Sequence, residues 1–169
     1  SMSHHVVLSL FDDAASAANA ARELRDFGVP RERVSIVARS HDEQVTLARQ
    51  SGASPGSELE DSAAAARLGE LGGHLLAAIA IVMPGIGPIV ADGPLAAELA
   101  EAAGHLAGGV SRTLERAGLP HPEAEQWETR IRAGAILVGA HVLQAQVDGA
   151  REVMRRNGSR GVVAGIWPD

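Results

Sequence analysis

A strand–helix–strand pattern occurs at both ends of this chain, and it constrains the fold more than any other feature of the sequence. At the N-terminal end, residues 5–11 form an apolar, β-branched run that predicts a strand. Asp12 and Asp13 follow this run and are good caps for a helix, which Gly28 ends. Residues 34–38 then predict a second strand, so the first forty residues form one β-α-β unit.

The C-terminal end repeats this order. Residues 135–142 predict a strand, apolar residues at helical spacing follow over 147–154, and residues 161–167 predict a last strand. Two such units that share one antiparallel sheet make an α+β fold, the ferredoxin-like split β-α-β plait, with both helices on one face. An insert interrupts the plait after its second strand. We therefore expect one domain in three parts: a first half over 1–50, a linker and helical insert over 51–133, and a second half over 134–169.

Alternation along the four strands predicts which residues face the two helices. On that face we expect Val6, Leu8, Leu10, Val34, Ile36, Ala38, Ile136, Val138, Ala140, Val162, Ala164 and Ile166. The other face is also apolar, with Val7, Phe11, Leu137, Val163 and Trp167. An open sheet face normally carries more polar residues. Either the insert or a second copy of the chain must therefore cover it.

The insert contains the most distinctive string of the chain, which runs from Met83 to Pro94 and holds three prolines and three glycines. Proline cannot continue a helix, so the string predicts a hairpin between two helices, the first of which runs from about residue 59 to Met83. The isoleucines of the string would be unfavourable in water. The tip of the hairpin is therefore expected to be buried.

Small residues recur at every fourth position on both arms of this predicted hairpin, and such ladders permit close contact between helices. The ladders are Ala65, Gly69, Gly73 and Ala77 before the tip, and Ala96, Ala100, Gly104 and Gly108 after it. We expect the hairpin and its tip to form an interaction surface. The residues assigned to that surface are Pro84, Gly85, Gly87, Pro88, Gly93, Pro94, Gly104 and Gly108.

The string Pro84–Pro88 and the step Ala91–Leu95 resemble those of bacterial general-stress proteins, a family described as heat-induced or low-temperature-induced. Residues 6–13, the turn at 118–120 and residues 134–138 are similar to the same pattern, so the resemblance covers nearly the full length. It implies a divided plait with an Ala/Gly-rich insert and a role in stress physiology. The family implies no established enzymatic reaction, so no catalytic residue is carried over.

Membrane contact is an alternative, because residues 71–91 contain no Asp, Glu, Lys or Arg. This run is long enough to span a bilayer, but prolines and glycines interrupt it and Asp92 follows closely. A buried hairpin in a soluble protein is therefore the leading interpretation. Reversible contact of the Pro84–Pro94 tip with a membrane surface or an apolar ligand is the alternative.

Metal binding is a further alternative. Two Glu-x-x-x-His pairs each place a carboxylate and an imidazole one helical turn apart. In the predicted hairpin the two histidines fall almost opposite each other, so the ligands would be Glu70, His74, Glu101 and His105. Pairs with this spacing are also common on plain helix surfaces, and we expect no metal.

Composition limits the remaining functions. The chain has no cysteine, which excludes thiolate metal sites and is typical of a cytoplasmic protein. The insert holds eleven acidic residues and five arginines and so accounts for the whole net charge of −6, which argues against nucleic acid as a partner. No P-loop, dinucleotide fingerprint or nucleophile elbow occurs, so we expect no catalytic residue and no cofactor.

Surplus apolar surface without a reactive group predicts a non-catalytic, stress-associated interaction or assembly protein. We expect a homo-oligomer that associates through the apolar sheet face, the helical hairpin, or both. Trp127 has two interpretations, because it lies on a predicted amphipathic helix. It either docks a partner or seals the insert against the sheet.

Overall fold

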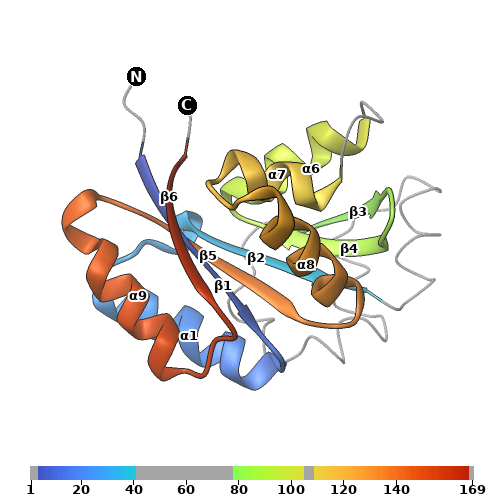
Figure 1. Ribbon diagram of the computed structural model, residues 1–169. Helices are drawn as coiled ribbons and strands as arrows, with labels where there is room; N and C mark the ends of the chain where they lie inside the picture. The colour runs from blue at the N-terminus through green and yellow to red at the C-terminus, as the bar shows by residue number, and fades with distance from the viewer. Residues whose placement is uncertain (1–3, 41–77, 105–108, 168–169) are drawn as a thin grey trace.

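The computed structural model describes residues 4–40, 78–104 and 109–167. These residues form one six-stranded sheet in the order β3-β4-β2-β5-β1-β6, in which every neighbouring pair is antiparallel. Helices cover both faces of the sheet, so the molecule has three layers (Figure 1). The predicted α+β fold class is confirmed.

The N-terminal unit consists of β1 (His4–Phe11), α1 (Ala14–Phe27), the 3-10 turn η1 (Arg31–Arg33) and β2 (Val34–Arg39). The Asp13 side chain caps α1 by accepting the Ser16 N–H at 2.8 Å, as the sequence predicts. Gly28 ends the helix with a φ of 115°, a left-handed conformation that favours glycine. The cap residues therefore set both ends of α1.

The C-terminal unit consists of β5 (Ile136–Val142), the 3-10 turn η2 (Gln144–Gln146), α9 (Val147–Arg156) and β6 (Val162–Trp167). β1 lies between β5 and β6, and β2 pairs with the other edge of β5. α1 and α9 pack beside each other on the same face of the sheet (Figure 1). The strands and helices of both units thus form where the sequence predicts them.

The predicted helical hairpin is wrong at its tip. Residues that were to end one helix form β3 (Ile79–Met83), and the string after it forms β4 (Gly87–Asp92). The two strands make a β-hairpin that extends the sheet from the edge of β2. Both strands contain isoleucine and valine, which favour strands. The edge of β2 also offers backbone N–H and C=O groups, and β4 pairs with them. Residues 59–77 of the predicted first helix lie outside the described residues.

Three helices cover the second face of the sheet: α6 (Pro94–Gly104), α7 (Val110–Arg116) and α8 (His121–Arg132). Their apolar side chains, including Trp127, share one buried cluster with Leu8 and Leu137 of the sheet. This face is therefore covered within one chain, by helices that lie within residues 51–133. Trp127 is 5% exposed and seals the insert against the sheet.

The predicted orientation of β1 is wrong. Val7 and Phe11 pack under α1 and α9, while Val6, Leu8 and Leu10 face the helices of the insert. Both rows of side chains on β1 are apolar because both faces of the sheet are covered. The alternation of polar and apolar residues therefore does not indicate which row faces α1 and α9. The predicted rows of β2 and β5 are correct, and Val162 of β6 also lies on the α1 and α9 side.

Candidate functional site

The proline–glycine string that was predicted to be an interaction tip forms the tight turn between β3 and β4. The Ile86 N–H donates to the Met83 carbonyl oxygen at 3.2 Å. Gly85 and Gly87 have φ angles of 84° and 99°, which glycine adopts without strain. Ile86 is buried, but Pro84 and Gly85 are exposed. The prediction of a buried tip is therefore wrong for these two residues.

The end of α8 and the side chain of Arg39 hold this turn in place. Arg132 donates from Nε to the Gly85 carbonyl oxygen at 2.7 Å, and Arg39 donates from Nη1 to the Arg132 carbonyl oxygen at 2.6 Å. Glu128 lies beside them and accepts the Ser111 N–H at 2.9 Å. A β-carbon at Gly85 would lie 3.2 Å from the Glu128 carboxylate. The turn is thus part of the protein's own packing.

Gly93 and Pro94 were predicted to contact a partner, but in the structure they position α6. A β-carbon on Gly93 would lie 2.5 Å from the Val34 carbonyl oxygen, and the φ of Gly93 is 82°. Pro94 is the first residue of α6, a position where its missing N–H is not needed. The Asp92 carboxylate accepts the Gly93 N–H at 2.8 Å. These contacts seat the start of α6 on β2.

Two other predicted features fall partly outside the described residues. α6 carries Ala96, Ala100 and Gly104 of the second ladder, and it packs against β2, β3, β4 and α7. The first ladder and Gly108 are not described, and neither are Glu70, His74 and His105 of the metal hypothesis. Glu101 is exposed on α6. Within 4–40, 78–104 and 109–167 no three acidic or histidine side chains form a metal-binding group.

A buried chain of polar side chains links β1, β5 and β2, and the sequence analysis did not find it. Ser35 Oγ lies 2.9 Å from His141 Nε2, and His141 Nδ1 lies 3.1 Å from His4 Nε2. Ser35 and His141 are 0% and 1% exposed. The rings of Trp167 and His141 pack nearly perpendicular to each other, with centroids 5.5 Å apart. The signs of this chain in the sequence are Ser35 and His141, each a polar residue within a mostly apolar strand.

Backbone and side-chain groups surround this chain closely. The Leu95 N–H donates to Ser35 Oγ at 3.0 Å, and Ser35 Oγ lies 2.9 Å from His141 Nε2, within hydrogen-bond distance. Burial lowers the pKa of His141 from 6.5 to about 3, and the charges of His4 and Arg33 act in the same direction. The imidazole is therefore neutral at pH 7. With a single ring proton, His141 donates one of its two hydrogen bonds and accepts the other, between Ser35 and His4.

A hydroxyl–imidazole pair is also the basic unit of a serine hydrolase. Here the hydroxyl cannot meet a substrate, because Ser35 is fully buried beneath the first turn of α6. The Ser35 oxygen already accepts a backbone N–H, and Gly93 closes over it, since a β-carbon there would lie 2.8 Å from Ser35 Oγ. The chain therefore acts as internal bonding that joins three strands to α6.

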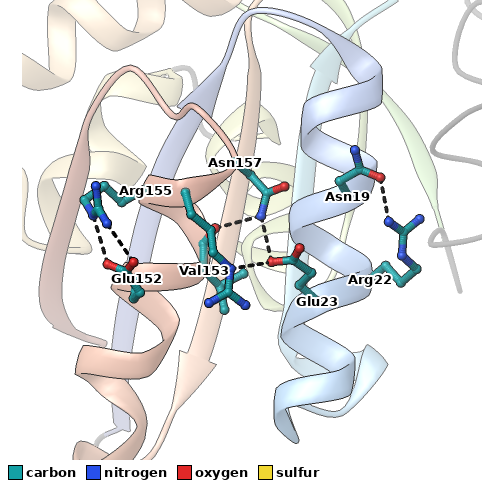
Figure 2. Close-up of polar contacts among 8 residues, drawn as sticks. Asn19, Arg22, Glu23, Glu152, Val153, Arg155 and Asn157 are labelled. Atoms are coloured by element: carbon teal, nitrogen blue, oxygen red, sulfur yellow. Dashed lines mark hydrogen bonds and ion pairs between the residues drawn. The ribbon is translucent and has the colours of Figure 1, made fainter.

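The outer face of α1 and α9 is occupied by polar contacts between the two helices (Figure 2). Glu23 Oε2 accepts from Arg156 Nε and from Asn157 Nδ2, each at 2.9 Å. These hydrogen bonds, with Arg156 as the larger influence, hold the pKa of the Glu23 carboxyl below its usual value. Arg155 makes a two-point contact with Glu152 at 2.9 and 2.7 Å. Glu23 and Arg156 are thus paired across the two helices, and Glu152 and Arg155 are paired along α9.

Three exposed apolar side chains lie at the end of the sheet where α9 begins. Leu143, just after β5, is 70% exposed, and Ile166 of β6 is 59% exposed. The register places Val142 and Ile166 on either side of His5, so Leu143 and Ile166 lie at the same end. Phe27, at the end of α1, is 42% exposed and touches Gly149 near the start of α9. We call Phe27, Leu143 and Ile166 the apolar end.

Two open hollows occur on the described surface. One of about 350 Å³ lies between Asp12, Arg130 and Arg160, and Arg160 already donates from Nε to Asp12 at 2.7 Å. The other, of about 560 Å³, follows the outer side of α8. No histidine lines either hollow, so neither contains a hydroxyl–imidazole pair. The hollows therefore add no reactive pair to the buried chain.

Among the described residues, no helix has both the length and the apolar character that crossing a bilayer requires. Comparison of the chain with family models, with curated proteins and with solved structures finds no match. The resemblance to general-stress proteins therefore stays a prediction from the sequence motifs.

Proposed function

We propose that this chain is a non-catalytic assembly protein that associates with itself. The observation that carries this proposal is the apolar end, because large apolar side chains that gather on a surface commonly mark an interaction site. A role in bacterial stress physiology is part of the proposal and rests on the resemblance of the Pro84–Pro88 string to general-stress proteins.

The burial of Ser35 supports a function without catalysis. Ser35 and His141 are the one hydroxyl–imidazole pair that the described residues bring within hydrogen-bond distance, and solvent does not reach it. Nucleophilic catalysis needs a hydroxyl that can reach a substrate atom. The pair is instead well suited to hold β2, β5 and the start of α6 together.

We also propose that the two β-α-β units form a ferredoxin-like plait that the insert divides. The strand order β2-β5-β1-β6 and the position of α1 and α9 on one face support this assignment. β3 and β4 then belong to the insert and widen the sheet beyond β2, while α6, α7 and α8 close its second face. The apolar sheet face is covered within one chain, so assembly in this proposal uses the apolar end and not that face.

Sedimentation velocity on the full chain over a hundredfold range of concentration tests the proposal. We expect the sedimentation coefficient to rise with concentration, and high salt not to reduce this rise, because apolar association is not screened by ions. A monomer at every concentration would contradict self-association. An oligomer that salt dissociates would point to charged surfaces and would contradict the apolar end as its cause.

A further inference from the structure

We propose that β6 is the strand through which two copies pair, edge to edge, as antiparallel neighbours about a twofold axis. This inference rests on the assembly function proposed above and names its partner and its surface. β6 is the last strand in the sheet order, and β1 is the one described strand that pairs with it. Its other edge therefore presents backbone N–H and C=O groups without a strand partner among the described residues.

The composition of β6 offers no protection against such pairing. Edge strands are commonly guarded by charged side chains, by proline or by bulges. The six residues of β6 are Val-Val-Ala-Gly-Ile-Trp, which include neither a charge nor a proline. Ala164 and Ile166 are exposed on the side of the sheet that carries α9. An unguarded apolar strand at an edge is a template for another strand.

β6 is also held in a fixed position, which lowers the entropy that pairing costs. A β-carbon on Gly165 would lie 2.2 Å from the Ala117 carbonyl oxygen, so β6 packs directly under the connection between α7 and α8. At one end Trp167 is buried against His141, and at the other the Arg160 N–H donates to the Leu10 carbonyl oxygen at 2.7 Å. The edge is thus prepared for a partner strand.

The partner that fits this edge is a second copy of the chain. All pairs in the sheet are antiparallel, and two β6 strands related by a twofold axis pair in the same way. Each copy then presents the same backbone N–H and C=O groups to the other. The charges of the two β-α-β halves sum to zero when both halves are counted together, since the insert holds the whole −6. At the start of β6, Arg160 is neutralised by Asp12 at 2.7 Å. Ile166 of the apolar end adds contact area at this edge.

Sedimentation velocity on the full chain and two matched variants tests this pairing. Ile166→Lys puts a charge beside the β6 edge, and Val82→Lys makes the same kind of change at an exposed residue on β3, the strand at the opposite edge. We expect Ile166→Lys to weaken association by about tenfold or more, since like charges meet across the pair, and Val82→Lys to leave it unchanged. Circular dichroism checks that both variants stay folded.

Cysteine cross-linking gives a second measurement, because the chain contains no cysteine of its own. Single variants Val162→Cys, Ala164→Cys and Ile166→Cys scan one side of β6, with Val82→Cys as the control. Cα atoms that face each other across an antiparallel pair lie about 4.5–5.5 Å apart, within the range of a disulfide. We expect at least one β6 variant to form a dimer under mild oxidation, and the control to form much less.

The outcomes separate this inference from the proposed function. If the unchanged chain associates but Ile166→Lys associates equally well and no β6 cysteine cross-links preferentially, the β6 edge is wrong while assembly stands. If the unchanged chain is a monomer throughout, assembly itself fails and the edge pairing fails with it.

Discussion

Acid should destabilise this protein through His141, a residue buried between Ser35 and His4. Burial lowers the pKa of its imidazole to about 3 in the folded chain, against 6.5 when it is exposed. Below pH 6.5 the unfolded chain therefore binds a proton that the folded chain does not bind. Unfolding takes up that proton, so the free energy of unfolding falls as the pH falls from about 6.5 toward about 3.

The magnitude follows from the same two pKa values. At pH 4.5 the unfolded imidazole is almost fully protonated while the folded imidazole is still neutral. This one group then removes about 3 kcal/mol from the free energy of unfolding relative to pH 7.5. A small domain has a total stability of about 5–15 kcal/mol, so the loss is readily measured.

Urea unfolding at pH values between 7.5 and 4.5 measures this effect. We compare the unchanged chain with His141→Gln, which keeps polar atoms near Ser35 and His4 but cannot be protonated in this range. His141→Gln should be less stable at pH 7.5, yet it should lose about 3 kcal/mol less on acidification. Equal pH dependence in the unchanged chain and His141→Gln would refute the reasoning.

Two further predictions concern backbone contacts. Gly93→Ala should lower the free energy of unfolding by more than about 2 kcal/mol, because its β-carbon would lie 2.5 Å from the Val34 carbonyl oxygen. Gly158→Ala has a similar φ of 84° but no atom within 4 Å, so urea unfolding should show a loss of about 1 kcal/mol there, and equal losses would contradict the steric argument. Arg132→Ala removes the hydrogen bond to the Gly85 carbonyl and should cost about 1 kcal/mol in the same assay. Hydrogen exchange at Ile86 and Gly87 should also become faster, and unchanged exchange at this turn would show that α8 does not hold it.

The sequence predicts elements well where local chemistry decides them. Asp13 and Gly28 fix the ends of α1 through a cap and a left-handed residue, and both signals are visible in the sequence. Residues 79–92 show the opposite case. Their small and β-branched residues suit either a helix ending at Pro84 or a strand, and the edge of β2 decides for the strand by offering backbone partners.

Contacts between distant residues explain what the sequence analysis missed. Helices cover both faces of the sheet, so both rows of side chains on β1 are apolar. Alternation of polar and apolar residues, which would show the row that faces α1, is therefore missing from this strand. The chain from Ser35 to His141 joins residues 106 positions apart, and neither residue has a neighbour in sequence that suggests the contact. Gly93 and Pro94 are predicted as part of an interaction surface. They are constrained by packing under α6, where an interaction surface was expected.

Hydrogen exchange of the β6 amides at low and high protein concentration tests self-association through this edge most directly. Every second residue of an edge strand directs its N–H away from its neighbour, so these amides exchange freely in a monomer. We predict that such amides within Val162–Trp167 become protected as the concentration rises, while exchange along Ile79–Met83 does not change. Exchange in β6 that is independent of concentration, in samples that do associate, would contradict the pairing of two copies through this strand.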